Sequence, residues 1–331
     1  MHRQMGQPSF AEAWLSEKLG QNERLERIGK VVDWGRIGEL VGQVHSAAEG
    51  RPSYPPLMMV KGLLLQQWHN LSDPGMEEML KDRISFRRFV GLGLEDDTPD
   101  HSTISRFRSG LAEMEVSERL FEELERQMEQ RGLVLKKGTL MDATIVEAQV
   151  RRPSISEGRG AKNRLDPDAD WTHTHRGKRS HFGYKVHLGV DEKTGTIRRA
   201  KLTPAKVYES EVAEELVCGD ERAVYADRAY ESKIRRQWLK SKGIKDRIMH
   251  RSHKHQKELP HWQKRRNELI DERRKLVEKV FGTMKRSYGY SRVRYRGLKR
   301  NAVEMWFKLM AYNLRKMVRF GAKPARRLGL A

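Results

Sequence analysis

Cysteine and long apolar runs are scarce in this chain, and each scarcity excludes a class of protein. Cys218 is the only cysteine among 331 residues, which excludes an internal disulfide framework and a zinc site built from cysteine pairs. No run of eighteen apolar residues occurs, so a transmembrane helix is not expected. The first six residues lack the apolar run of a signal peptide. These absences predict a soluble, globular, cytoplasmic protein.

Acidic residues are also outnumbered. Forty-five Asp and Glu stand against 66 Lys and Arg, giving a formal net charge of +21. A field of that sign attracts phosphate backbones through counterion release, so a nucleic acid is the expected partner and a nucleoid-associated location follows. The excess is concentrated between Arg228 and Arg319. A charged surface without a nucleic-acid partner and an RNA-binding housekeeping role are the alternatives.

The first 132 residues predict an all-α N-terminal domain. Prolines between positions 52 and 56 prevent a helix there, and a mostly buried helix is expected directly after them. Ser72 with Asp73 caps the next helix. Helices are expected at 10–19, 25–40, 57–68, in one or two short pieces at 80–90, at 103–111 and at 117–131. The helix at 103–111 resembles a DNA reader, with Arg106 and Arg108 as candidate DNA contacts; an ordinary surface helix is the alternative.

After Gly132 the apolar period changes to that of strands. Strands are expected at 133–150, 181–191, 196–203, 222–226 and 244–249, with helices at 209–217 and 231–241. This order predicts a mixed sheet with helices on its faces, in a domain spanning 133–318. Residues 151–180 are expected to form a surface loop, and 319–331 a basic tail. Asp166, Asp168 and Asp170 imitate a calcium loop, but Trp171 and Gly177 stand where that loop needs Gly and Glu.

Three acidic residues occupy positions that folding chains usually keep apolar. Asp142 lies inside the apolar run 139–146, Asp227 follows the apolar run 223–226, and Glu278 lies on an amphipathic helix. A carboxylate in such a place loses solvation worth several kcal/mol unless it is protonated, paired or bound to a cation. The pattern predicts a site where all three share two magnesium ions, with manganese as a possible substitute, for metal-assisted phosphodiester cleavage and transfer.

Each acid also has a simpler explanation. Asp142 could be a strand-end carboxylate that accepts backbone amides, and Asp227 could cap the helix near Glu231. Glu278 lies beside the apolar arc of its helix together with Arg274 and Lys285, so it could form an ordinary ion pair with Arg274. Glu268 and Glu272 are rival ligands on the same helix, but Glu268 lies on the opposite edge of the apolar arc and Glu272 well round the solvent side.

Several motifs together resemble the DDE transposases of bacterial insertion sequences, specifically the family of insertion sequence five. The resemblance spans nearly the whole chain. It rests on WHNLSD at 68–73, MDATIVEA at 141–148, HFGYKVHLGVD at 181–191, ADRAY at 226–230, RKLVEKVFGTMKR at 274–286 and YGYSRVRYRGL at 288–298.

The resemblance implies a ribonuclease-H-like catalytic domain behind a helical domain that binds the terminal inverted repeats of the element. It implies cleavage of double-stranded DNA at those repeats, joining of the 3′-hydroxyls to target DNA, and at least a dimer in the working complex. Arg274 and Lys285 match the family's Arg, Glu, Lys signature, whereas Asp271 stands where that signature has Tyr. Lys285 is expected to hold a phosphate near the cut. A nuclease without strand transfer and a silent DNA-binding regulator are the alternatives.

Two further clusters are candidates for binding. Tyr288, Tyr290 and Tyr295 alternate with arginines, a composition typical of aromatic packing on DNA; a solvated basic loop is the alternative. The arginines expected to hold phosphates are Arg286, Arg292, Arg294 and Arg296. The four histidines of the second cluster are expected to belong to a basic connector rather than to a metal site, because an all-histidine site is uncommon. They are His250, His253, His255 and His261.

Overall fold

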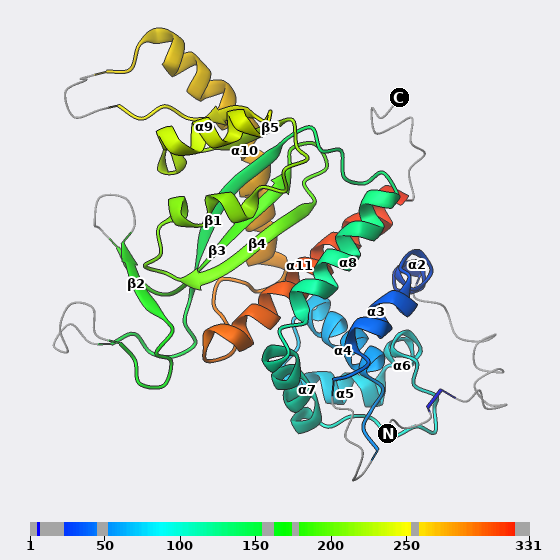
Figure 1. Cartoon of the computed structure of the whole chain (residues 1–331). Helices are drawn as coiled ribbons and strands as arrows, with labels where there is room; N and C mark the ends of the chain where they lie inside the picture. Colours follow the sequence, from blue (N-terminus) through cyan, green and yellow to red (C-terminus); the bar gives the residue numbers. More distant parts are fainter. Residues whose placement is uncertain are drawn as a thin grey trace. The chain divides into compact units, whose positions relative to one another are not determined.

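The computed structural model describes residues 5–6, 23–44, 52–153, 162–173, 179–252 and 258–321. The chain divides into two compact units, residues 1–131 with 303–331 and residues 132–302 (Figure 1). The predicted helix at 10–19 lies outside the described residues, and so do His253 and His255. The predicted domain bounds, 1–132, 133–318 and 319–331, stay a prediction. No described helix is both long enough and apolar enough to cross a membrane.

The first unit is helical, as predicted. Its helices are α2 (Glu23–Val31), α3 (Trp34–Val41), α4 (Pro56–His69), α5 (Asp73–Asp82), α6 (Ile84–Val90), α7 (His101–Glu113) and α8 (Ser117–Gln130), joined by the part of α11 (Leu298–Gly321) from residue 303 onward. The predicted single segment at 25–40 is two helices. Asp33 ends the first segment, because its carboxylate accepts the backbone N–H of Gly35 and Arg36 and so starts a new helix.

The core of this unit forms around α4, which is buried on nearly all sides. Phe121 on α8 packs against Trp306 on α11, with 5.0 Å between ring centroids. The indole N–H of Trp68 donates to the carbonyl of Ala311 at 2.8 Å. The apolar residues from Met305 to Leu314 therefore act as the closing core helix that their pattern predicts, and they complete this unit.

The second unit contains a six-stranded mixed sheet. Its strands are β1 (Thr139–Glu147), β2 (Asp170–His173), β3 (Ser180–Asp191), β4 (Ile197–Pro204), β5 (Ala223–Ala226) and β6 (Lys245–Ile248). β1 is central: it pairs antiparallel with β3 and parallel with β5, and β6 continues the parallel side. β2 and β4 share the other edge of β3. This mixed sheet with flanking helices is the predicted α/β class.

Two local predictions in this unit are wrong. The expected loop at 151–180 contains β2, because Trp171 packs on Phe182 of β3 with ring centroids 5.3 Å apart. The expected helix at 209–217 is instead two 3₁₀ turns, η2 (Glu209–Glu211) and η3 (Ala213–Leu216). Ala213 and Leu216, three residues apart, both enter the core, and a three-residue repeat is the periodicity of a 3₁₀ turn.

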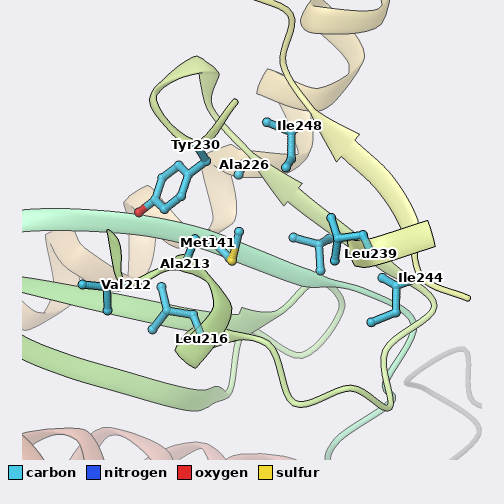
Figure 2. Packing of buried hydrophobic residues seen from close by; sticks show 10 residues of the cluster. Met141, Val212, Ala213, Leu216, Ala226, Tyr230, Leu239, Ile244 and Ile248 are labelled. Carbon is cyan, nitrogen blue, oxygen red and sulfur yellow. The ribbon is translucent and has the colours of Figure 1, made fainter. Parts of the chain in front are cut away.

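Helices and one further turn complete the second unit. η4 (Arg228–Tyr230) follows β5, and α9 (Lys233–Ser241) leads to β6. The long α10 (His261–Ser287) packs against β1 and β5 (Figure 1). A buried cluster ties these pieces together: Met141 of β1, Ala226 of β5, Tyr230 of η4 and Leu216 of η3 belong to it, along with residues of α9 and β6 (Figure 2). The cluster fixes the strand positions that adjoin Asp142 and Asp227.

Candidate active site

Asp142 lies on the central strand, and its surroundings favour a neutral or neutralised carboxyl. Its Oδ1 accepts the backbone N–H of Ala143 at 2.9 Å and lies 3.2 Å from the guanidinium of Arg274. Burial raises the pKa of Asp142 to about 6, against the opposing effect of Arg274. The negative charges of Asp227 and Glu278 also contribute to this rise, so both acids lie within electrostatic reach of Asp142.

Asp227 directly follows β5, the parallel neighbour of β1. Thr139 is opposite Val224 in that pairing, and continuing the register by three residues brings position 142 level with position 227. The carboxylate of Asp227 accepts the N–H of Ala229 at 2.8 Å, so Asp227 does cap a turn. The turn is η4, however, since α9 has Ser232 as its own cap. Capping and membership of an acidic site are therefore compatible.

α10 brings both a cation and an acid toward β1. Arg274 is buried, and it pairs with Asp142 and more distantly with Asp271, at 3.9 Å. The predicted alternative of an ordinary ion pair between Arg274 and Glu278 is therefore replaced by a pair with Asp142. Glu278 itself is solvent-exposed. The sequence had predicted a position beside the core rather than in solvent. The rival Glu268 pairs with Arg265 at 3.0 Å, and Glu272 is exposed.

The donor chemistry of this site suits a hard divalent cation, although its carboxylates are not arranged around one point in this structure. Among the described residues no three His, Cys, Asp or Glu side chains are arranged to hold a metal ion, and Asp142 faces a guanidinium instead. The groups that converge are carboxylates, the ligands that Mg²⁺ prefers. Close by, the buried hydroxyl of Tyr230 has no hydrogen-bond partner. An excess of negative charge beside a buried hydroxyl oxygen that lacks a partner fits a bound cation.

Glu209 is an acid of this region that the sequence did not single out. It starts η2, which packs against η4, and its Oε1 lies 3.9 Å from the ammonium of Lys185. Burial raises the pKa of Glu209 to about 7; Lys185 opposes this rise, and Asp227 and Asp142 add to it. The helix expected at 209–217 contains several acids, and its pattern gave no reason to single out Glu209 as a functional residue. The only local signal was an acid directly after a tyrosine, five positions beyond the end of β4.

The basic segment after α10 is attached to the end of β1. Glu147 donates its N–H to the carbonyl of Ser291 at 3.0 Å and accepts the N–H of Val293 at 2.9 Å. Lys285 is half-buried; burial lowers its pKa, and Glu147 opposes this change. The arginines that follow Lys285 differ in exposure. Arg286, Arg292 and Arg296 are exposed, and Arg294 is half-buried.

Four side chains that were predicted to contact DNA are buried in this structure. Tyr288 and Tyr290 are 1% and 2% exposed, so they pack in the protein core and are not available to bases. Arg108 is buried, and its guanidinium binds both carboxylate oxygens of Asp73, whereas Arg106 is exposed. Arg274 is committed to Asp142. The alternation of residue types did not reveal this burial.

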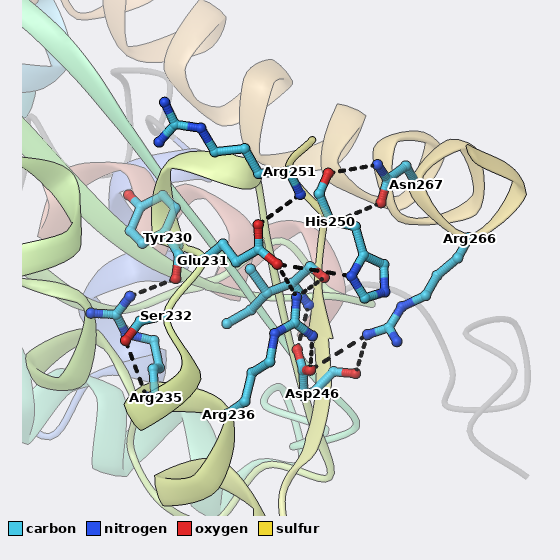
Figure 3. Close-up of polar contacts among 11 residues, drawn as sticks. Tyr230, Glu231, Ser232, Arg235, Arg236, Asp246, His250, Arg251, Arg266 and Asn267 are labelled. Carbon is cyan, nitrogen blue, oxygen red and sulfur yellow. Dashed lines mark hydrogen bonds and ion pairs between the residues drawn. The ribbon is translucent and has the colours of Figure 1, made fainter. Parts of the chain in front are cut away.

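His250 is part of a polar connection between β6 and α10 (Figure 3). Its backbone N–H donates to Asn267 Oδ1 at 2.8 Å, and its carbonyl accepts from Asn267 Nδ2 at 3.0 Å. Its ring Nδ1 lies 3.8 Å from Glu231, which also accepts the N–H of Arg251. These contacts give His250 a structural surrounding. The described members of the predicted histidine group, His250 and His261, belong to no metal-ligand cluster of described residues.

Comparison with known proteins gives the family. A family model described as "Transposase DDE domain" matches residues 135–314, and one described as "Transposase domain (DUF772)" matches residues 14–110. The chain therefore belongs to the transposase DDE domain family, and this pair of matches is typical of transposases like that of insertion sequence five. The resemblance inferred from the motifs is confirmed.

A solved structure also resembles the chain, at low identity. It is a cryo-EM structure of the piggyBac transposase synaptic complex with hairpin DNA. The two share 10% sequence identity with a TM-score of 0.42, over 89% of this chain and 72% of that chain. The family match makes the protein a DNA transposase, an enzyme of DNA strand cleavage and phosphoryl transfer. Transposase DDE domains use divalent metal ions.

Proposed function

We propose that this transposase binds the terminal inverted repeats of its insertion sequence, cleaves each 3′ end by hydrolysis with two magnesium ions, and joins the freed hydroxyls to target DNA. The observation that carries the proposal is the strand register that brings Asp142 level with Asp227. The electrostatic effect of Glu278 on Asp142 adds the third acid. The three carboxylates act as metal ligands, and Mn²⁺ can replace Mg²⁺.

The bound ions would activate the attacking water or 3′-hydroxyl and neutralise charge that develops on the phosphate oxygens. Arg274 compensates part of the mutual repulsion of the carboxylates, because it is buried and pairs with Asp142. Lys285 lies on the same face of α10 as Glu278, about two turns later, and holds a phosphate close to the cut. Arg286, Arg292, Arg294 and Arg296 extend a basic surface for the DNA backbone. Arg106 on α7, in the other compact unit, is a separate candidate contact with DNA.

Cleavage at both ends of one element requires two active sites in one complex. We therefore include at least a dimer in the proposed working assembly. The DNA substrate is double-stranded, with repeats at the element ends and an unrelated target.

The test uses duplex DNA carrying the repeats that flank the gene, incubated with Mg²⁺, Mn²⁺ or EDTA. Asp142→Ala, Asp227→Ala and Glu278→Ala are each expected to abolish nicking while DNA binding in a mobility-shift assay remains, because they remove metal ligands and leave the basic surface intact. Glu268→Ala is the matched control on the same helix and should nick like the wild type. Nicking that persists in one of the three variants removes that residue from the proposed site.

A second arm separates transposition from simple nuclease activity. Labelled element ends are mixed with an unlabelled target plasmid, and joined products are resolved on a gel. The proposal expects label in the plasmid. Cleaved ends without any joined product would contradict strand transfer while leaving the cleavage site in place.

A further inference from the structure

The segment that carries Glu209 is fixed against the turn that follows Asp227. Arg235, which is buried, makes the connection: its guanidinium donates to the carbonyl of Tyr230 at 2.5 Å and to the carbonyl of Ser210 at 2.5 Å. It also donates to Glu214 at 2.8 Å. One side chain thus links η2, η3 and η4, so Glu209 and Asp227 are held in neighbouring turns.

The same buried cluster positions Glu209, Asp142 and Asp227. Met141 and Ala226, the residues immediately before the two aspartates, belong to it. Val212, three residues after Glu209, belongs to it as well (Figure 2). Because each acid is adjacent or nearly adjacent to a residue packed in one core, the three backbone segments have little freedom to separate.

Tyr230 supplies an independent indication that this place takes a ligand. Its side chain is fully buried, and its hydroxyl has no hydrogen-bond partner. The hydroxyl lies in the electrostatic field of Glu209, Asp142 and Asp227, and the same three charges, with burial, raise the pKa of Tyr230. A buried donor without a partner is costly, so it is expected to gain one when the site is filled.

The charges also do not balance. Asp142, Asp227, Glu209 and Glu278 carry four potential negative charges, and the buried cations beside them are Arg274 and Lys185. Lys185 is partly engaged elsewhere, because its ammonium donates to the carbonyl of Val207 at 2.8 Å. The excess of two negative charges matches one divalent cation, which would lie on the η2 side of Asp142.

We propose that Glu209 is a fourth acidic ligand of the metal site, which holds a divalent cation together with Asp142 and Asp227. The hydroxyl of Tyr230 orients the carboxylates around that cation. This inference rests on the proposed function, because it adds a ligand to the same site. It assigns to the turn after β4 a role that the three-acid arrangement leaves out.

The experiment measures Mn²⁺ binding by the full chain without DNA. Free Mn²⁺ is followed by electron paramagnetic resonance during a titration of the wild type, Glu209→Gln, Glu209→Asp, Asp142→Asn and Glu215→Gln. Glu209→Gln is expected to weaken the tightest Mn²⁺ site roughly tenfold or more, since it removes a charged ligand. Glu209→Asp should recover part of that loss. Glu215→Gln is the matched control; Glu215 is exposed and pairs with Lys201.

The outcomes distinguish the inference from the proposed function. If Asp142→Asn loses Mn²⁺ while Glu209→Gln binds it like the wild type, Glu209 is not a ligand, and the three-acid site stands. If the wild type binds no Mn²⁺, or Asp142→Asn binds it normally, the proposed metal site itself fails and this inference fails with it. Melting curves in EDTA identify any variant that does not fold, and Glu209→Asp then carries the comparison.

Discussion

Two arginines on α7 have opposite surroundings, although they are only two positions apart. Arg106 is exposed and contacts Thr103 on its own helix, while Arg108 is buried on Asp73 and Gln66. Arg108→Ala is expected to lower the free energy of unfolding by about 1.5–3 kcal/mol, because the half-buried Asp73 loses its charged hydrogen-bond donor and keeps Gln66 as a neutral one. Arg106→Ala should change it by no more than about 0.5 kcal/mol. Urea denaturation of both variants measures the difference.

Equal losses for the two variants would contradict this assignment. The burial of Arg108 was within reach of the sequence. With Ile104, Phe107 and Leu111 it completes the i, i+3, i+4, i+7 stripe of the buried face, so its position on the helix already indicated the interior. Arg108 was predicted to contact DNA because it is an arginine, although its position on the helix indicated burial. The partner, Asp73, is 35 residues away and follows from no local pattern.

His187 makes the stability of the fold depend on pH. It is fully buried on β3 and its Nε2 lies 2.9 Å from Thr203 Oγ1. Burial, together with the positive charges of Lys185 and Lys201, lowers the pKa of His187 to about 3. Below the ordinary pKa of 6.5 the unfolded chain binds a proton that the folded chain does not, so stability falls with falling pH until about pH 3.

The expected loss between pH 6.5 and pH 5 is about 2 kcal/mol, at about 1.4 kcal/mol for each pH unit. His187→Gln keeps a polar group for Thr203 but does not titrate, so this part of the pH dependence should disappear. Denaturant unfolding of both proteins at the two pH values gives the comparison, in which the other titrating groups cancel. Identical pH dependence in the two proteins would show that His187 is not held neutral.

At the scale of elements, α10 must be held in place for Glu278 to reach the site. Asn267 makes two hydrogen bonds to the backbone of His250, just after β6, and so joins the helix to the parallel side of the sheet (Figure 3). Asn267→Ala is expected to cost about 1–3 kcal/mol, because both backbone groups lose their partner in a half-buried place. Hydrogen exchange at the His250 amide should accelerate accordingly.

The control for this change is Glu268→Ala, at the next residue of the helix, because Glu268 is exposed and pairs with Arg265 at 3.0 Å. It should leave the exchange of the His250 amide unchanged. An amide that remains equally protected in Asn267→Ala would show that the connection does not depend on Asn267. Reduced cleavage in Asn267→Ala with unchanged DNA binding is the expected functional result.

Elements with their own end signals were predictable from the sequence. α5 and α7 begin where Ser72 and Asp100 accept a backbone N–H, and such caps are visible in the local sequence. β2 was not predictable, because its four residues depend on pairing with β3. The same applies to η2 and η3, whose geometry follows from what they pack against. Local signals therefore gave the helices, and long-range pairing decided the rest.

At the scale of the whole molecule, three acids far apart in the chain become one candidate site through strand order. The parallel pairing of β1 with β5 leaves no trace in the local pattern of either strand, so periodicity indicated that Asp142 and Asp227 needed compensation but not that they are neighbours. The motif resemblance supplied that link. Neither source indicated Glu209, because its place depends on how η2 folds back after β4.

The net charge of +21 predicts strong salt dependence of DNA binding. Each phosphate that the protein neutralises contributes about −0.9 to the slope of log K against log salt, so about four contacts would weaken binding roughly tenfold for each doubling of salt. Fluorescence anisotropy with a labelled repeat duplex between low and moderate salt measures this slope. Arg296→Gln removes one exposed guanidinium of the proposed basic surface and should make the slope shallower by about 0.9 if it contacts a phosphate. Binding that hardly responds to salt would mean that the positive charge is not what holds the DNA, and the basic surface after α10 would lose its proposed role.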